Sequence, residues 1–75
     1  MDGYEELANA IILQAVKDWR QAVRTQKKHP RYQPALTMRE ECERFFLGEW
    51  FGMLTKVDGR MILQKLKQEE KIHDE

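Results

Sequence analysis

Residues 41–54 read ECERFFLGEWFGML, and this stretch decides how the chain can fold. It holds four of the seven aromatic residues of the protein, namely Phe45, Phe46, Trp50 and Phe51. Gly48 lies between the two aromatic pairs and predicts the end of one helix, followed by a sharp turn into a short helix over residues 49–55. A single helix that bends at Gly48 is the alternative. The large side chains point in too many directions for one interior, so we interpret the stretch as part core and part interface.

Upstream of this stretch, residues 4–27 predict one long helix. Alanine, leucine, glutamine, glutamate, lysine and arginine dominate it, and all of them favour the helix. Apolar side chains recur every three or four residues, which is the spacing of one helical stripe. The residues of this stripe are Tyr4, Ala8, Ile11, Ala15, Trp19 and Ala22.

Two prolines mark the break after the long helix. Pro30 and Pro34 disfavour helical angles in the residues before them, so residues 28–36 are predicted to form a loop. Residues 37–40 read TMRE, which fits a capping box in which the threonine and glutamate side chains bond to backbone N–H groups. The second helix is therefore predicted over residues 38–47.

The last helix is predicted over residues 59–71, because Asp58 is a favoured N-cap residue directly before it. Residues 72–75 form a tail that we expect to fray. Together these elements predict a single all-α domain, residues 1–75, built as a small bundle of three to four helices.

Composition and charge exclude several classes of function. Thirteen basic and thirteen acidic residues cancel, so no overall field favours nucleic acid or an anionic membrane. The longest apolar run, residues 10–13, is too short to span a bilayer, and the acidic N-terminus argues against a signal peptide; a cytoplasmic protein is expected. The only cysteine, Cys42, is interpreted as a small buried side chain rather than a nucleophile. Two histidines and this cysteine form no metal-binding spacing, so we expect no metal, no cofactor and no enzyme.

The first helix carries more apolar side chains than a small monomer can cover. Residues 10–16 read AIILQAV, and at about 100° per residue their six apolar groups occupy most of the helix circumference. We therefore expect part of this surface to bind a protein partner, and the chain to form a homo-oligomer. The predicted contact residues are Ile11, Ile12, Trp19, Trp50 and Phe51, with Arg20 and Arg24 as a polar rim.

A basic stretch leaves a second function open. From residue 17 to residue 39, seven basic side chains stand against one acidic side chain, Asp18. Such a region could bind phosphate groups, which would make the protein a nucleic-acid or nucleotide-binding regulator. The candidate residues are Arg20, Arg24, Lys27, Lys28 and Arg31. The alternative interpretation is that these charges stabilise the end of the first helix and pair with the acidic face of the second.

Two segments of the chain resemble a known group of proteins. ELANAIILQAVKDWR near the start and ECERFFLGEWFGMLTKVDGRMILQKL further on are similar to small uncharacterised helical proteins of phages and integrated elements in Gram-positive bacteria. The resemblance covers roughly residues 5–68, and in those relatives a serine often stands where this chain has Gly48. It implies a non-enzymatic accessory protein in the cytoplasm of a bacterial host that acts by binding another protein. Phage accessory proteins of this size include inhibitors of host defence systems such as CRISPR nucleases.

Overall fold

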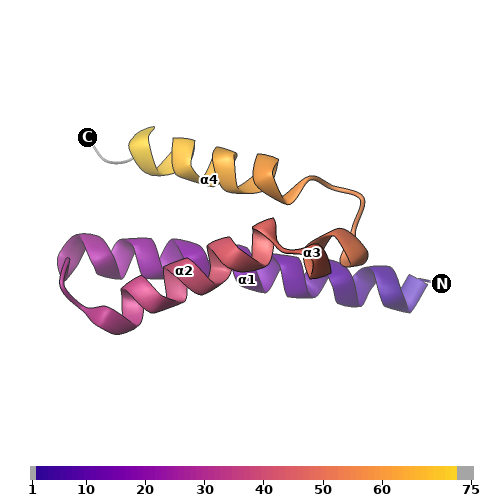
Figure 1. Cartoon of the computed structure of the whole chain (residues 1–75), viewed down its shortest axis with the longest axis horizontal. Helices are drawn as coiled ribbons and strands as arrows, with labels where there is room; N and C mark the ends of the chain where they lie inside the picture. Colours follow the sequence, from indigo (N-terminus) through magenta and orange to yellow (C-terminus); the bar gives the residue numbers. More distant parts are fainter. Residues whose placement is uncertain (1, 73–75) are drawn as a thin grey trace.

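The computed structural model describes the backbone of residues 2–72, and it is all-α (Figure 1). Its helices are α1 (Asp2–Lys28), α2 (Gln33–Leu47), α3 (Glu49–Leu54) and α4 (Gly59–Ile72). The predicted small helical bundle is therefore confirmed. Residues 73–75, which make up most of the predicted frayed tail, lie outside the described residues, and so does the side chain of Tyr4. Within the described part of the chain, no helix combines the length and apolar character needed to cross a membrane.

α2 packs against both α1 and α4, and the three long helices run along the long axis of the molecule (Figure 1). α1 runs the length of the molecule, α2 runs back antiparallel beside it, and α4 returns in the direction of α1 (Figure 1). With 27 residues, α1 is about 40 Å long, which nearly equals the longest extent of the molecule, 42 Å. Because α2 and α4 are much shorter, they cannot cover every side of α1.

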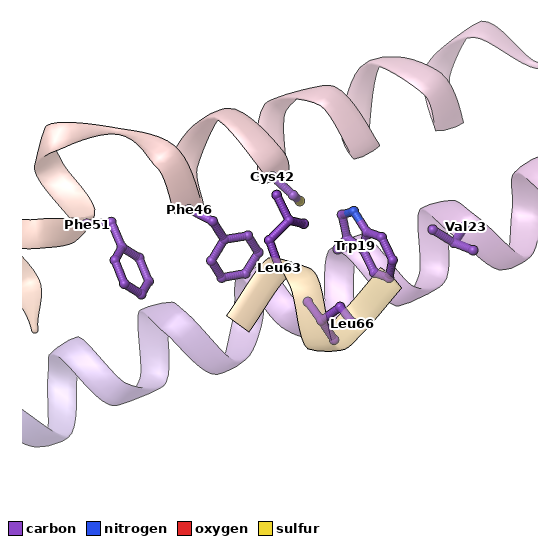
Figure 2. Packing of buried hydrophobic residues seen from close by; sticks show 7 residues of the cluster. All are labelled: Trp19, Val23, Cys42, Phe46, Phe51, Leu63 and Leu66. Carbon is purple, nitrogen blue, oxygen red and sulfur yellow. The ribbon is translucent and has the colours of Figure 1, made fainter. Parts of the chain in front are cut away.

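The core draws side chains from all four helices (Figure 2). Its buried members are Trp19, Val23, Cys42, Phe46, Phe51, Leu63 and Leu66. Three of them, Trp19, Phe46 and Phe51, are the largest side chains that the fold hides almost completely. Burial of one large apolar side chain contributes about 1.5–3 kcal/mol, so these three rings account for much of the stability of so small a chain.

The prediction that Trp19 and Phe51 contact a partner is wrong, because each residue is only 2% exposed within the single chain. Trp19 lies in the second half of α1, where it donates a hydrogen bond to Glu43 of α2 and lies beside Leu66 of α4. Phe51 lies under the start of α4, beside Gly59. The return of α4 over the hairpin of α1 and α2 therefore moves both rings from the surface into the core.

The start of α2 differs from the prediction. The helix begins at Gln33 rather than at residue 38, so the connecting turn covers only residues 29–32. Pro34 lies in the first turn, where its missing N–H costs no helical hydrogen bond. The predicted capping box at residues 37–40 is wrong, because these residues lie inside the helix. The earlier start lets Ala35 pack against the rest of the protein, where it is 5% exposed.

The predicted end of α2 at Gly48 and the predicted start of α4 after Asp58 are confirmed. Gly48 ends α2 with an extended backbone, and its N–H donates to the carbonyl oxygen of Phe45 at 3.3 Å. A single helix through Gly48 is therefore ruled out. Asp58 acts as the N-cap of α4, because its Oδ1 accepts a hydrogen bond from the backbone N–H of Arg60 at 3.0 Å.

Candidate functional site

The folded chain leaves many large apolar side chains in solvent, as the sequence predicts. Leu7, Leu13, Leu47, Trp50, Met53, Val57 and Met61 are each more than half exposed. Single exposed apolar residues are normal on soluble proteins, and only a contiguous patch points to binding. A binding surface therefore requires that one of these exposed side chains lies next to other apolar groups.

One such surface is a shallow groove between α1 and α2 that is closed at one end by α3. Its volume is about 330 Å³, and we call it the Trp50 groove. Its lining residues are Ile11, Gln14, Ala15 and Asp18 of α1, Glu41, Cys42 and Phe45 of α2, and Trp50 of α3. Most of the lining is apolar, with the polar groups concentrated toward one end.

Helical spacing explains why these side chains meet. On α1, Ile11, Ala15 and Asp18 follow each other at intervals of four and three, so they lie on one face. On the antiparallel α2, Glu41 and Phe45 have the same spacing, which places Glu41 near the Asp18 end and Phe45 near the Ile11 end.

The break at Gly48 brings Trp50 back onto this surface. The indole ring packs edge-on against the ring of Phe45, with 5.9 Å between ring centroids. Phe45 also contacts the buried rings of Phe46 and Phe51, at 5.6 and 5.5 Å. Trp50 therefore rests on the core through Phe45 while remaining 57% exposed. An aromatic side chain that is held in place and still accessible is a typical anchor for a binding partner.

The opposite end of the groove is negatively charged. It carries the carboxylates of Asp18 and Glu41, and the Nε2 group of Gln14 donates a hydrogen bond to Asp18 Oδ1 at 3.0 Å. Cys42 lies in the floor between the two helices. The pKa of its thiol is raised, first by burial and then by the negative charges of Asp18, Glu41 and Glu43. The thiol therefore stays protonated at neutral pH, which does not suit a nucleophile.

The predicted contact residues divide between surface and interior. Ile11 and Trp50 lie in the groove, as an interface requires. Ile12 is half-buried and packs against the core from the α1 side. Trp19 and Phe51 belong to the core and offer no contact surface.

The predicted basic patch is split over two places. Arg20, Arg24 and Lys27 line a hollow between α1 and α4, and the same hollow contains Glu69 and Glu70. Arg20 forms an ion pair with Glu69, with 2.8 Å between Nη2 and Oε2. The acidic partner of Arg20 therefore comes from α4 and not, as the alternative interpretation predicted, from the second helix. Lys28 and Arg31 line a separate hollow at the turn between α1 and α2, beside Tyr32.

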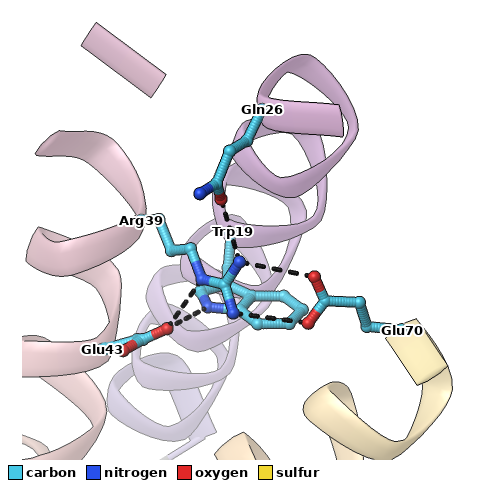
Figure 3. Close-up of polar contacts among 5 residues, drawn as sticks. All are labelled: Trp19, Gln26, Arg39, Glu43 and Glu70. Carbon is cyan, nitrogen blue, oxygen red and sulfur yellow. Dashed lines mark hydrogen bonds and ion pairs between the residues drawn. The ribbon is translucent and has the colours of Figure 1, made fainter. Parts of the chain in front are cut away.

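A polar cluster around Arg39 holds three helices together (Figure 3). Its guanidinium donates to Gln26 of α1 at 2.9 Å, to Glu43 of α2 at 3.0 Å and to both carboxylate oxygens of Glu70 of α4 at 3.3 Å. It also lies over the ring of Trp19, whose Nε1 donates to Glu43 at 3.1 Å. Four of the five N–H donors of Arg39 are used within the fold, so Arg39 has a structural role. Sequence reasoning missed this cluster, because Arg39 and its partner Glu70 are 31 positions apart in the chain.

Two further findings bear on function. Among the described residues, no three histidine, cysteine, aspartate or glutamate side chains are placed so that they could hold a metal ion together. Comparison with protein-family models, with curated proteins and with solved structures gives no match to this chain. The function is therefore inferred from the geometry and charge of the protein's own surface.

Proposed function

We propose that this protein is a non-enzymatic binding protein that docks on another protein through the Trp50 groove. The observation that carries the proposal is the state of Trp50, which is packed on Phe45 and yet 57% exposed. Tryptophan is among the residues that contribute most to protein–protein binding, with losses of 2 kcal/mol or more, on the order of a thirtyfold change in affinity, when it is truncated.

A protein bound at the groove would also cover the surface around it. A standard interface buries about 800 Å² on each partner, which is roughly an eighth of the 6125 Å² accessible surface of this chain. Leu7 precedes Ile11 by one helical turn and is 61% exposed, so it extends the apolar surface of α1 beyond the groove.

The biological setting rests on the resemblance to phage and integrated-element proteins alone. On that basis we propose an accessory protein in the cytoplasm of a bacterial host, whose partner is a regulatory or defence component such as a CRISPR nuclease. The groove supports protein binding in general and favours no particular host protein.

The test of the proposed function is a selection from a displayed library of random peptides. Peptides enriched on the wild-type protein should lose binding to a Trp50→Ala variant, because the variant lacks the anchor. Tyr32→Ala is the matched control, since Tyr32 is an aromatic residue of similar exposure, 52%, at the far turn. Both variants should keep the wild-type circular dichroism spectrum. If no enriched peptide distinguishes Trp50→Ala from wild type, the groove is not the binding surface.

Nucleic-acid or nucleotide binding remains the second candidate, and its residues are open to a direct test. The pairing of Arg20 with Glu69 and the use of Arg39 inside the fold both reduce the charge available to phosphates. If the basic residues bind nucleic acid, a mobility shift at low salt should weaken steeply as salt rises and disappear when Lys27 and Lys28 are changed to glutamate.

The predicted homo-oligomer stays a prediction. Leu13 is 59% exposed and lies two residues from both Ile11 and Ala15, so its side chain leaves α1 on a different face from the groove. If α1 mediates self-association through that face, light scattering should show a smaller species for Leu13→Gln than for the wild-type chain, while peptide binding in the groove is unchanged.

A further inference from the structure

We infer that the Trp50 groove takes a positively charged amphipathic helix of the partner, with an apolar side chain at Trp50 and a lysine or arginine at Asp18 and Glu41. This inference rests on the proposed function and adds the chemistry of the partner to it. It follows from the way in which apolar and charged groups are separated along the groove.

The apolar half of the groove sets the first requirement. Ile11, Phe45 and Trp50 lie at one end, and Ala15 and Cys42 form a floor of small side chains in the middle. An alanine and a cysteine leave room for a side chain of the partner to enter between α1 and α2. A leucine, methionine or aromatic residue inserted there would bury its own apolar surface together with that of Trp50.

The charged half sets the second requirement. The described residues that line the groove include two acidic side chains, Asp18 and Glu41, and no lysine or arginine. The raised pKa of the Cys42 thiol agrees with a negative field at this point. Burial is the largest cause of the rise, and the charges of Asp18 and Glu41 add to it. A partner that covered these carboxylates with apolar or acidic groups would strip them of water without compensation. A lysine or arginine would instead form charge-assisted hydrogen bonds with them.

The same reasoning disfavours a symmetric dimer in which the grooves of two copies of this chain face each other. A symmetric dimer places the same patch of both copies in one interface. Each pair of carboxylates, Asp18 and Glu41, would then meet a patch whose lining has no lysine or arginine. Four carboxylates would be partly buried without a cationic partner, which disfavours that pairing.

The length of the groove defines the spacing of the partner's residues. Ile11 and Asp18 are seven positions apart on α1, which corresponds to about 10.5 Å or two helical turns. A partner helix lying along the groove therefore presents its apolar anchor and its basic residue about seven positions apart, or about four apart when a long lysine or arginine side chain reaches the carboxylates.

The probes for this inference are two synthetic helical peptides of about four turns. They share the same leucines and differ only in carrying lysine or glutamate at every polar position. Fluorescence anisotropy measures their binding to four proteins: wild type, Trp50→Ala, the double variant Asp18→Asn/Glu41→Gln, and Glu40→Gln. The last is the matched control, because Glu40 is an exposed acid on α2 that does not line the groove.

The lysine peptide should bind wild type and Glu40→Gln alike, and the glutamate peptide should bind neither. The affinity of the lysine peptide should fall about tenfold in the double variant, because two partly exposed ion pairs are lost. Trp50→Ala should bind the lysine peptide about thirtyfold more weakly, or worse. These three results together support the inference.

The inference is overturned if the glutamate peptide binds as tightly as the lysine peptide, or if the double variant keeps its full affinity. In either case a dependence on Trp50 would leave the proposed function standing. Failure of both peptides to bind the wild-type protein also overturns the inference, and the random-library selection then decides on the proposed function separately.

Discussion

Substitution of Gly59 by alanine tests how tightly α4 is seated on the rest of the protein. Gly59 is buried at the first position of α4, directly above the end of α2. A Cβ atom built on it would lie 1.9 Å from the carbonyl oxygen of Phe46 and 3.0 Å from the ring of Phe51. The oxygen belongs to the backbone of a helix, so it cannot rotate away as a side chain could. The start of α4 must move instead.

The size of that movement follows from the contact distance. Carbon and oxygen atoms in close backbone contacts are about 3.3 Å apart, so the 1.9 Å approach requires a shift of about 1.4 Å. Such a shift pulls Leu63 and Leu66 away from the core, where they are 5% and 4% exposed. Overpacking of this kind typically costs about 1–3 kcal/mol. The higher helix propensity of alanine recovers at most about 1 kcal/mol.

We therefore expect Gly59→Ala to lower the free energy of unfolding by about 2 kcal/mol, a large part of the roughly 4–11 kcal/mol available to a chain of this size. The corresponding drop in Tm is about 8–16 °C. Urea denaturation followed by circular dichroism measures the change. Gly52→Ala is the matched control, because nothing lies within 4 Å of its added Cβ. That variant should be stabilised by about 0.5–1 kcal/mol. If Gly59→Ala unfolds at the same urea concentration as wild type, the close seating of α4 is refuted.

Four further predictions concern the polar groups of the fold. Arg39→Met should lower the free energy of unfolding by about 2 kcal/mol, because Glu43 and Glu70 lose their partner in a partly buried site. Arg20→Met should cost less than about 0.5 kcal/mol, because its ion pair is exposed. Burial alone would raise the pKa of Glu43, but hydrogen bonds from Trp19 and Arg39 and the positive charges of Lys67 and Arg39 outweigh it and lower the pKa below 4.5. Glu43 therefore stabilises the fold above about pH 4.5. This contribution disappears as pH falls through the lowered pKa that Glu43 has in the folded state. In the Glu43→Gln variant, the free energy of unfolding should therefore fall less steeply as pH is lowered into the acid range. Cys42 should react with a thiol reagent much more slowly in the native protein than in urea, because its thiol is buried and its pKa is raised.

Each of these predictions has an outcome that contradicts it. Equal losses for Arg39→Met and Arg20→Met in urea titrations would show that the Arg39 cluster is no more stabilising than a surface pair. An unchanged fall in stability at acid pH in Glu43→Gln would assign the acid sensitivity to other carboxylates. Rapid modification of Cys42 without denaturant would mean that α1 and α2 separate readily at the groove.

The helix pattern was largely readable from local sequence. The break at Gly48 and the N-cap at Asp58 both depend on residues within one turn of the boundary, and both are observed. The start of α2 was not readable in this way. Proline signals a loop or a first helical turn equally well, and only the burial of Ala35 against the rest of the protein selects the earlier start.

Which aromatic residues are buried could not be predicted from the sequence. Trp19 and Phe51 became core residues because α4 folds back over them, and Trp50 stayed exposed because the turn at Gly48 places it beyond that cover. Helical periodicity assigns a side chain to a face of its own helix. It does not say which neighbouring helix will cover that face.

By itself, the sequence determined that this protein is a small helical bundle with more apolar side chains than it can bury. Both properties follow from residue types and spacings that act along a single helix. Only the tertiary structure decided that the exposed surface is a groove with Trp50 at one end and Asp18 and Glu41 at the other. These residues come from three helices, and their relative positions depend on how α2, α3 and α4 pack against α1, which no local pattern of residues encodes.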